Sequence, residues 1–451
     1  MAKRPPKSKL GRMARLGSLT SRVSSTYLGQ RVKGVFQNED SRDRDMSRLH
    51  LRNAERVVDT MGALKGAAMK VGQSLALAMD GVDVPPEVSR ILSKLHDSAE
   101  PVPFADIRAT IEAELGAPLE ELFLSFDEEP LGSASLAQAH AAQLPDGTQV
   151  VVKALYTGIE NSVDADLGAL RSLLITSRMV RRDPAEIRAI FDEIRSRLNE
   201  ELDYYKEAAN LEEFHAAYQG VPGVRIPRTH PSHCSGRVLT MDRLIGQSAE
   251  DFSRTASPEA KQRAGEILAE TFYDMTYRLR ALHADPHGGN YLFGPDGSVG
   301  IIDFGCVKRF DMYWIANYAD MALGFLDGEH ERAMTKAVEL GVLAHRDPKA
   351  EEVLQTFAML ICKPLMSPDY TCGADGDNVT AEVAKLAPTI LRYPSLRSPP
   401  ELVFLHRSLG GIYTLLRKLG HTADYGKLYR RYATHAVGVA AGEIEDGAEV
   451  P

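Results

Sequence analysis

Cysteine is scarce in this sequence, and no two cysteines stand at the spacing of a disulfide framework or a metal site. The 451 residues contain four Cys, and none of them belongs to a CxxC pair. Sparse, unpaired cysteines are typical of proteins from a reducing compartment. The sequence also shows no apolar run long enough to cross a bilayer, no secretory leader and no repeat of solenoid period. These absences argue against a disulfide-rich secreted protein, a membrane-spanning protein and a repeat protein.

Acidic side chains are missing from residues 1–38, which carry nine Lys and Arg. The whole chain has a net charge of -9, so the remainder is strongly acidic. Such a basic arm predicts contact with an anionic membrane surface, and we expect no nucleic-acid partner. Residues 10–36 fit an amphipathic interfacial helix or one packed on the protein's own core. A solvated basic leader and an organellar transit peptide are the alternatives to a cytoplasmic protein bound peripherally to a membrane.

Composition and length indicate a globular protein of about two or three domains. Apolar residues make up 44% of the chain and charged residues 25%. Helical spacing, and breaks at Gly and Pro, predict an α+β fold that is mostly α-helical. The expected order is a basic segment over 1–40, a helical extension over 41–128, a small sheet with inserted helices over 129–242, and a helical lobe over 243–451.

Local patterns predict particular elements within this order. A hairpin is expected over 134–156, because two half-buried strands flank the turn-forming sequence PDG. Residues 223–230 and 236–244 have the pattern of two further strands. A helix is expected over 103–115, ended by Gly116.

Two acids and an amide stand close together in HADPHGGNYLFGPDGSVGIIDFG, residues 283–305. The turn GPDG predicts a tight hairpin that brings Asn290 close to Asp303, and Asp285 precedes Asn290 in a glycine-loosened loop. Mg²⁺ prefers oxygen ligands shared with substrate phosphates, so Asn290 and Asp303 are the predicted metal ligands. The spacing of Asp, four residues, Asn and then DFG is that of a kinase catalytic loop. Each acid alone fits a turn cap, whereas the three together favour phosphoryl transfer.

A kinase also needs a Lys on an upstream strand and a Glu on a following helix. Lys153 lies in VVVKALY, and a Lys on an apolar strand is costly unless it is paired. Several acids follow in EELDYYKEAAN, where Glu207 precedes two Ala and can approach a sheet closely. A solvated helix face is the alternative for any one of these acids. The order Lys, Glu, Asp, Asn, Asp favours the kinase-like interpretation.

A glycine-rich phosphate loop is absent before Lys153, and the equivalent place holds EPLGSASLAQAH. Backbone N–H groups of such a turn can still face phosphates, although side chains narrow its conformational range. Helical sequence resumes near Asp311, which leaves no room for an activation segment, and no APE motif follows. The platform on which protein kinases lay a peptide is therefore not expected.

Taken together, these motifs resemble the UbiB family of atypical kinase-like proteins, the group involved in coenzyme Q (ubiquinone) biosynthesis. The resemblance runs from about residue 50 to 440 and includes GSASLAQAH, VVVKALYTGI, ELDYYKEAAN, HADPHGGN and IIDFG. Its most specific marker is GAAMKVGQ, in which Lys70, Gly72 and Gln73 match the family's KxGQ motif. Glu201 and Asp203 match the ExD motif, which is expected to contact the KxGQ region.

The resemblance implies a protein-kinase-like bilobal fold with a helical KxGQ extension over the place where a peptide substrate would bind. It also implies that Glu207 pairs with Lys153, and that the protein has ATPase activity and membrane-lipid contacts rather than ordinary protein kinase action. The family's Ala-rich loop is expected to favour particular nucleotide binding, but its first position here is Gly132. No transmembrane helices follow residue 440, so membrane contact is expected to be peripheral.

The resulting hypothesis is an ATP- or ADP-binding, Mg²⁺-dependent ATPase or unorthodox kinase that serves quinone or isoprenoid-lipid metabolism, with lipids or quinone-pathway enzymes as partners. Lys153 is expected to hold the α/β-phosphates, and Asp285 to orient or deprotonate the nucleophile. The residues expected to contact the nucleotide are Gly132, Ser133, Ala134, Ser135, Lys153, Asp242 and Leu244, the last two in the adenine hinge. The residues expected to regulate the site are Lys70, Gly72, Gln73, Glu201 and Asp203, with Lys70 also affecting catalysis. The rivals are a nucleotide-gated scaffold with little turnover and a small-molecule phosphotransferase, against which the KxGQ extension argues.

Overall fold

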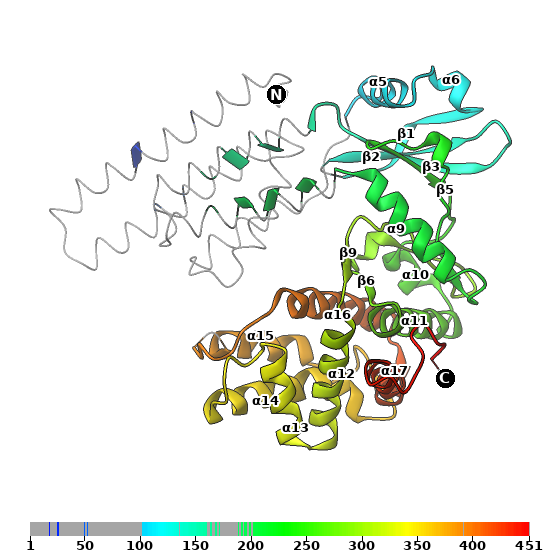
Figure 1. The fold of residues 1–451 in the computed structure, drawn as a ribbon. Coiled ribbons are helices and arrows are strands. Elements are labelled where there is room, and N and C mark those ends of the chain that lie inside the picture. Colours follow the sequence, from blue (N-terminus) through cyan, green and yellow to red (C-terminus); the bar gives the residue numbers. More distant parts are fainter. Residues whose placement is uncertain are drawn as a thin grey trace. The chain divides into compact units, whose positions relative to one another are not determined.

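The chain divides into two compact units, which are described separately (Figure 1). The computed structural model describes residues 102–134, 136–159, 202–390 and 392–450, with scattered positions before and between them. Unit 1 comprises Met1–Ala208 and Thr229–Arg243, and unit 2 comprises Ala209–Arg228 and Leu244–Pro451. The sequence interpretation kept residues 209–228 with the small sheet. They belong instead to unit 2, because β4 (Val224–Arg225) pairs with a strand of that unit.

Unit 1 is built on an antiparallel sheet in the order β1-β2-β3-β5. The elements are α5 (Phe104–Leu115), α6 (Leu119–Leu122), β1 (Ser125–Ser133), β2 (Ala137–Gln143), β3 (Gln149–Leu155), the 3-10 turn η2 (Pro231–His233) and β5 (Val238–Asp242). Successive side chains of a strand alternate between the faces of its sheet. Val150, Val152 and Ala154 of β3 are fully buried, as are Ile107 and Ile111 of α5, which packs against β3.

The hairpin predicted over 134–156 is present, with β2 and β3 paired from Ala137 opposite Leu155 to Gln143 opposite Gln149. Gly147 closes its turn at φ 88°, a left-handed conformation that glycine adopts without strain. The edge strand β1 was not predicted, and its register with β2 shifts on both sides of Pro130. Pro has no N–H to donate to the hydrogen bonds between strands, so within a sheet it is found at edges and bulges. A segment that contains Pro is therefore not readily predicted as a strand from its sequence.

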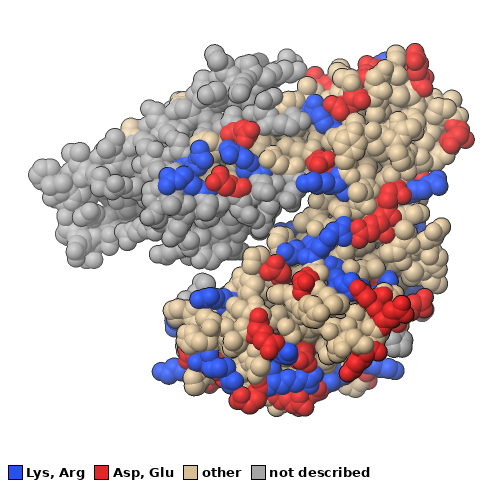
Figure 2. Space-filling view, in the orientation of Figure 1, with Lys and Arg blue, Asp and Glu red and all other residues tan. Residues whose placement is uncertain are grey.

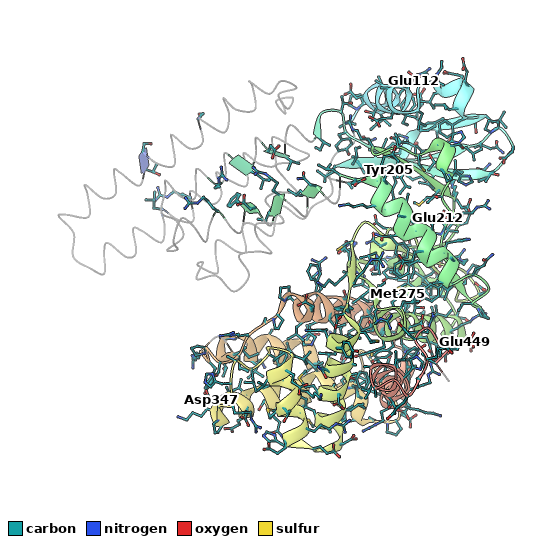
Figure 3. All side chains as sticks on the ribbon, viewed as in Figure 1. Glu112, Tyr205, Glu212, Met275, Asp347 and Glu449 are labelled. Atoms are coloured by element: carbon teal, nitrogen blue, oxygen red, sulfur yellow. The ribbon has the colours of Figure 1, made fainter. Side chains whose placement is uncertain are left out.

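Helix α5 ends where the sequence predicts, at Gly116, which has φ 75° and donates its N–H to Glu112 O. The Glu112 carboxylate, labelled in Figure 3, accepts from Arg108 and from the backbone N–H of Leu119. This carboxylate therefore ties the end of α5 to the start of α6.

Unit 2 is mainly helical. Its helices are α10 (Ala249–Thr255), α11 (Pro258–Tyr273), α12 (Met312–Asp327), α13 (His330–Glu339), α14 (Pro348–Cys362), α15 (Val379–Ile390), α16 (Pro400–Leu419) and α17 (Tyr425–Ala440). The π-helix η3 (Asp274–Arg278) continues α11, and the 3-10 turns are η4 (Gly288–Asn290) and η5 (Lys363–Met366). Helix α11 packs on α16, and α12 packs on α13 and α17. In the described part of the chain, no helix combines the length and apolarity needed to span a bilayer.

Unit 2 also contains short strands, which flank its loops. They are β4, β6 (Ala281–His283), β7 (Tyr291–Phe293), β8 (Val299–Ile301), β9 (Val307–Arg309), β10 (Tyr370–Thr371) and β11 (Thr422–Ala423). β7 and β8 form an antiparallel hairpin around the predicted GPDG turn, and β4 lies parallel to β8. The segment 223–230, predicted as a full strand, is therefore reduced to the two residues of β4.

Helix α9 (Tyr204–Ala217) follows the ExD motif in the sequence, and α12 follows the DFG sequence. The first residues of α9 belong to unit 1 and the remainder to unit 2. Helix α12 begins at Met312, where the Asp311 carboxylate accepts from the N–H groups of Tyr313 and Trp314. Helix thus resumes directly after Asp311, as the sequence predicts.

Candidate active site

The lysine of β3 forms a nearly buried ion pair with a glutamate of α9. Lys153 Nζ lies 2.7 Å from Glu207 Oε1, and only 14% and 6% of the two side chains are exposed. Strand alternation turns Lys153 to the face opposite Val152 and Ala154. Removing one partner of such a pair leaves an uncompensated buried charge. The structure therefore brings together the two side chains that the sequence proposes as partners.

Asp203 lies at the start of α9 and helps to begin the helix. Its Oδ1 accepts the N–H of Tyr205 at 3.2 Å, and Tyr204 N–H donates to Gly236 O at 3.0 Å. These bonds fix the helix end from which Glu207 extends. Lys70, Gly72, Gln73 and Glu201 lie outside the described residues, so contact between the ExD and KxGQ motifs stays a prediction.

The candidate phosphate loop is a tight turn between β1 and β2. Gly132 and Ser133 end β1, opposite Ala139 and Gln138. Ala134 N–H donates to Ala137 O at 2.8 Å, and Ala134 O accepts from Tyr156 Oη at 2.9 Å. Burial raises the pKa of Tyr156 to about 12, so its hydroxyl stays protonated and donates. The Ala134 N–H is used within the hairpin rather than offered to a phosphate, and Ser135 lies outside the described residues.

The candidate adenine hinge lies at the end of β5. Asp242 Oδ1 is 2.8 Å from His230 Nε2, and the side chain of Asp242 is 33% exposed. Arg243 N–H donates to Gln149 O, which continues the pairing of β3 with β5 by one residue. The chain passes from unit 1 to unit 2 at Leu244, which is half-buried. A role for Asp242 and Leu244 at the adenine stays a prediction.

In unit 2, the loop that carries Asp285 follows a strained residue. Arg280 has φ 53° and is the one non-glycine residue with positive φ in the described part of the chain. Backbone strain of this kind clusters at functional sites. Strand β6 then pairs with β9 and leads into the loop. Asp285 Oδ1 lies 3.1 Å from Arg407 Nη2 of α16, which also donates to Ala284 O.

Asn290 is oriented by the same loop. Its Nδ2 donates to Asp285 O at 2.8 Å, with a longer contact of 3.4 Å to Asp285 Oδ2. Because the amide nitrogen is engaged, the amide oxygen is turned toward the other side, where it can serve as a ligand. Ile302 N–H donates to Asn290 O at 3.0 Å, so the β7–β8 hairpin places Asn290 opposite the residue before Asp303. Asp303 Oδ1 accepts the N–H of Gly305 at 3.0 Å.

The aromatic residue of the DFG sequence is locked in the interior of unit 2. Phe304 is fully buried and stacks on Phe214 of α9, with ring centroids 4.5 Å apart. Asn210, one turn earlier in α9, donates its Nδ2 to Phe304 O at 3.0 Å. The second half of α9 therefore fixes the backbone and the ring beside Asp303.

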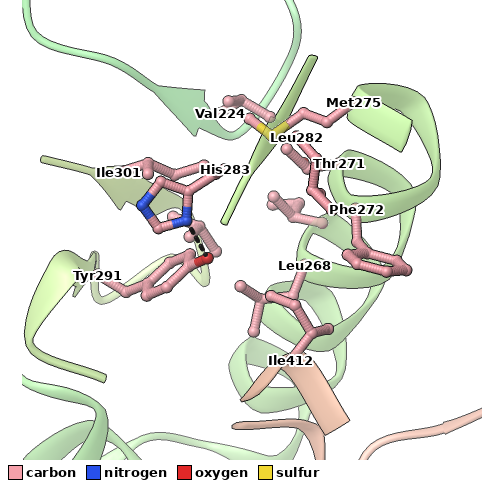
Figure 4. A pocket seen from close by; sticks show the side chains of 12 residues that line it. Val224, Leu268, Thr271, Phe272, Met275, Leu282, His283, Tyr291, Ile301 and Ile412 are labelled. Carbon is pink, nitrogen blue, oxygen red and sulfur yellow. Dashed lines mark hydrogen bonds between the residues drawn. The ribbon is translucent and has the colours of Figure 1, made fainter. Parts of the chain in front are cut away.

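His283 has a structural place behind this ring. It is 3% exposed, lies edge-on to Phe304 at 5.4 Å, and its Nδ1 is 3.3 Å from Tyr291 Oη (Figure 4). Burial raises the pKa of Tyr291 above its ordinary value. The small cavity around these side chains, about 10 Å³, is otherwise lined by apolar residues and Thr271. His283 is thus a core residue of the loop, whereas His287 is exposed.

Sequence reasoning missed two residues that hold the site. Arg407 lies in the segment PPELVFLHRSLGG and Asn210 at the end of ELDYYKEAAN, and neither was predicted to belong to the site. An Arg among apolar helical residues is a signal that its side chain has an acidic partner, although the sequence does not identify Asp285 as that partner. Asn210 gives no such signal, because its backbone partner at Phe304 is 94 residues away.

Comparison with known proteins identifies relatives of this chain. The model of the ABC1 atypical kinase-like domain matches residues 94–337, more than half of the chain. "Atypical kinase COQ8, mitochondrial" of Saccharomyces cerevisiae is 26% identical over 451 residues, covering 96% of this chain and 86% of the relative. "Atypical kinase COQ8B, mitochondrial" of Rattus norvegicus is 28% identical over 440 residues, covering 95% and 81%. "Probable protein kinase UbiB" of Xanthomonas campestris is 29% identical over 374 residues, covering 79% and 65%.

A solved structure supports the fold. The Mycobacterium tuberculosis protein solved in complex with erythromycin has a TM-score of 0.61 and 24% identity, and the match covers 86% of this chain and 98% of that one. The stretch matched by the domain model includes Lys153, Glu207, Asp285, Asn290 and Asp303. The chain has an α+β kinase-like fold and belongs to the family of ABC1 atypical kinase-like proteins, as do the COQ8 and UbiB kinases.

Proposed function

We propose that the protein is an ATP-binding, Mg²⁺-dependent atypical kinase or ATPase that serves quinone or isoprenoid-lipid metabolism at a membrane surface. The observation that carries this proposal is the ion pair of Lys153 and Glu207, with 2.7 Å between the charged atoms and little exposure of either side chain. Replacing a buried pair by apolar residues is often neutral or stabilising, so stability alone does not account for such a pair. A Lys held on a strand by a helix Glu is the arrangement with which kinases hold nucleotide phosphates.

The remaining residues take roles that their local geometry supports. Lys153 binds the α/β-phosphates, with Glu207 keeping its ammonium in place. Asp285 orients or deprotonates the nucleophile, either water or a substrate hydroxyl. Asn290 fixes the loop through Asp285 O and offers its amide oxygen to a cation.

Asn290 and Asp303 fit a Mg²⁺ ion. Both supply hard oxygen ligands, and the hairpin bond from Ile302 to Asn290 holds their backbones close together. No cluster of three His, Cys, Asp or Glu able to hold a metal occurs among the described residues. A cation held here would complete its shell with nucleotide phosphates and water, and it would neutralise charge on the transferring phosphoryl group.

A scaffold with little turnover is the second candidate, and Arg407 favours it. The Arg407 guanidinium lies 3.1 Å from Asp285 Oδ1, and the Asp285 side chain is 49% exposed. A carboxylate oxygen that accepts a hydrogen bond from a guanidinium is occupied and less available to a substrate hydroxyl. ATP turnover in the presence of anionic vesicles separates the two candidates, because a scaffold binds nucleotide without hydrolysing it.

The pathway and the membrane surface are proposed from the family and from the basic arm. The relatives in yeast and rat carry the names of mitochondrial atypical kinases. Residues 1–38, with nine basic side chains and no acid, suit an anionic leaflet. Quinone profiling of a deletion strain tests the pathway: an unchanged quinone pool would exclude a role in quinone synthesis.

The metal assignment is tested by Asp303→Asn, with Asp296→Asn as the matched control. Asp296 lies in the exposed turn between β7 and β8 and accepts from Ser298 N–H. We expect Asp303→Asn to lose most of the thermal stabilisation that Mg-ATP confers, while its melting temperature without nucleotide stays close to wild type. Asp296→Asn should keep the full nucleotide-dependent shift. An Asp303→Asn protein that is folded and shifts as wild type would refute the assignment.

A further inference from the structure

A pocket of about 240 Å³ lies among the helices of unit 2, and none of the residues assigned to phosphoryl transfer lines it. Its walls come mainly from α11, α14, α15, α16 and α17, which Figure 1 shows in green through red. Protein interiors are close-packed and rarely leave voids larger than a water molecule. An apolar space of this size among packed helices calls for an occupant.

The walls of this pocket are apolar and aromatic. Phe272, Phe357, Leu409 and Leu416 contribute to them, and no Lys, Arg, Asp or Glu lines the pocket among the residues that the structure describes. A charged ligand would lose its hydration here without gaining a counter-charge. The occupant is therefore uncharged and mostly hydrocarbon.

One tyrosine hydroxyl in the walls lacks a partner among the described residues. The hydroxyl of Tyr273 makes no hydrogen bond to any described residue, although the side chain is only 7% exposed. Burial raises the pKa of Tyr273, and the thiols of Cys362 and Cys372 raise it further. Tyr273 and both cysteines line the pocket, and the raised pKa keeps the Tyr273 hydroxyl protonated as a donor.

The neighbouring polar groups already have partners. Tyr318 Oη is 2.9 Å from His406 Nε2, and Tyr425 Oη contacts both His421 Nδ1 and Cys372 Sγ. Tyr413 donates to Asp377 and Tyr429 to Ala319 O, and Tyr277 is hydrogen-bonded to Tyr429. Among the tyrosine hydroxyls that line the pocket, Tyr273 is thus the one left for a ligand. A largely buried donor without an acceptor loses part of its hydration, and a ligand acceptor replaces that loss.

We propose that this pocket binds an uncharged lipid whose polar end is a ring carbonyl, with the carbonyl oxygen accepting the Tyr273 hydroxyl and the hydrocarbon against the aromatic walls. An apolar cavity of about 150 Å³ is known to bind benzene. The pocket here admits a ring and several further carbons. A second pocket of about 300 Å³ shares Tyr318, Phe357 and His406 with it, which gives a longer chain room to continue.

This site goes beyond the proposed phosphoryl transfer and does not depend on it. Helix α16 separates the two functions within unit 2. Arg407 of α16 reaches Asp285, whereas His406, Leu409 and Tyr413 of the same helix line the pocket. Nucleotide-site variants therefore leave the pocket intact.

The chain contains its own probe for this pocket. Trp314 is the single tryptophan, and its ring stacks on Tyr318, which lines the pocket, with centroids 5.8 Å apart. A quinone bound beside Tyr318 lies close enough to quench this fluorescence. The probe ligand is 2,3-dimethyl-1,4-naphthoquinone, whose methyl groups block addition of thiols to the ring. The matched ligands are 2,3-dimethylnaphthalene, which lacks the carbonyls, and 2-naphthoate, which is charged.

Equilibrium dialysis and Trp314 quenching are measured on the full chain. We expect wild type to bind the quinone and the hydrocarbon but not the naphthoate. Tyr273→Phe removes only the hydroxyl, so it should weaken quinone binding about fivefold, the effect of one neutral hydrogen bond, and leave hydrocarbon binding unchanged. Val383→Phe should weaken both by filling the half-buried rim of the pocket.

Two control variants keep the outcome clear. Tyr205→Phe removes the hydroxyl of an exposed tyrosine of α9, labelled in Figure 3, and should change nothing. Asp303→Asn should lose Mg-ATP stabilisation and keep quinone binding, which separates this site from the proposed function. The proposal is overturned if no neutral ligand binds, if naphthoate binds as well as the quinone, if dialysis detects quinone binding without quenching, or if Tyr273→Phe affects both neutral ligands alike.

Discussion

At the residue scale, hydrogen bonds divide the candidate active site into groups that hold the loop and groups that are proposed to bind a ligand. Asn290 uses its amide nitrogen on Asp285 O, which leaves the amide oxygen for a cation. Asp303 anchors Gly305 through one carboxylate oxygen. Arg407 holds Asp285 in a half-exposed pair, and such a pair contributes about 0–1 kcal/mol to stability. Arg407 therefore matters more for the position of Asp285 than for folding.

Gly132 is the residue at which the phosphate turn departs from the family, and the structure allows a side chain there. A Cβ at Gly132 would meet nothing within 4 Å, and its φ is not positive. We expect Gly132→Ala to change the free energy of unfolding by less than about 0.5 kcal/mol. We also expect it to change the relative stabilisation by Mg-ATP and Mg-ADP, because the added methyl narrows the conformational range of the turn that is proposed to face the phosphates.

Gly116→Ala is the matched control for this change, and thermal shifts with each nucleotide are the measurement. Gly116 also faces open space, but its φ is 75°. The Ala variant there should lose about 1 kcal/mol of stability from backbone strain and keep the wild-type nucleotide preference. Identical thermal shifts of Gly132→Ala and wild type with each nucleotide would show that the turn does not contact the nucleotide.

At the element scale, helix α9 links the Lys153 pair to the DFG sequence. Glu207, Asn210 and Phe214 stand at intervals of three and four residues, which places them on one face of the helix. Glu207 binds Lys153, and the other two hold Phe304. The first part of α9 therefore holds the ion pair of unit 1, and the remainder holds the DFG sequence of unit 2.

The ion pair between β3 and α9 is tested by a double-mutant cycle. Glu207→Leu should destabilise unit 1 by about 3–5 kcal/mol, because it leaves the Lys153 ammonium buried without a counter-charge. Adding Lys153→Met should restore much of that loss, since the pair is then replaced by apolar groups. Denaturant unfolding of the two single variants and the double variant measures the coupling. Additive losses would mean that the two charges do not depend on each other.

His421 makes the packing of α11 against the end of α16 sensitive to acid. It is 1% exposed, and a Cβ at Gly265 of α11 would lie 2.3 Å from its ring. Burial lowers the pKa of His421 to about 4 from its ordinary value of 6.5. Between these two pH values His421 is protonated in the unfolded chain but stays neutral in the folded chain. The folded state therefore loses stability as the pH falls.

We expect the free energy of unfolding to fall between pH 6.5 and pH 4, with His421 contributing up to about 3 kcal/mol. His421→Gln should be less stable at pH 7 but should show a shallower decline over this range. His406, whose pKa burial also lowers to about 4, accounts for part of the decline that remains. Parallel stability curves for wild type and His421→Gln would show that His421 does not contribute.

At the scale of the whole molecule, charge is distributed unevenly along the chain. Residues 1–38 are purely basic, whereas the remainder is acidic. On the described part of the face in Figure 2, acidic and basic side chains are interspersed. The strongest single-sign feature is therefore the N-terminal sequence.

Deletion of residues 1–38 should abolish binding to anionic vesicles. Each Lys or Arg near an anionic surface gains roughly 1 kcal/mol, and salt screens that gain. Co-sedimentation should show salt-sensitive binding of the full chain and none of the truncated chain. A chain of full length with the nine basic residues changed to Gln is the matched control, and it should also fail to bind. Equal co-sedimentation of full-length and truncated protein would place the membrane contact elsewhere.

The sequence by itself determined the elements whose signals are local. Gly116 ends α5, Asp311 begins α12, and the PDG and GPDG turns close their hairpins, because capping and turn chemistry act within a few residues. The order of charged residues also pointed to a Lys–Glu pair, since a Lys on an apolar strand needs a partner. The kinase-like fold follows from this order and from the family that it resembles.

The tertiary structure decided what depends on contacts between distant segments. Asn210 holds Phe304 and Arg407 holds Asp285 across 94 and 122 residues, distances at which no periodicity relates the partners. The assignment of residues 209–228 to unit 2 likewise comes from long-range packing. The apolar pocket beside Tyr273 could not be foreseen, because an aromatic residue on a buried helix face has the same pattern whether the neighbouring helices close on it or leave a space.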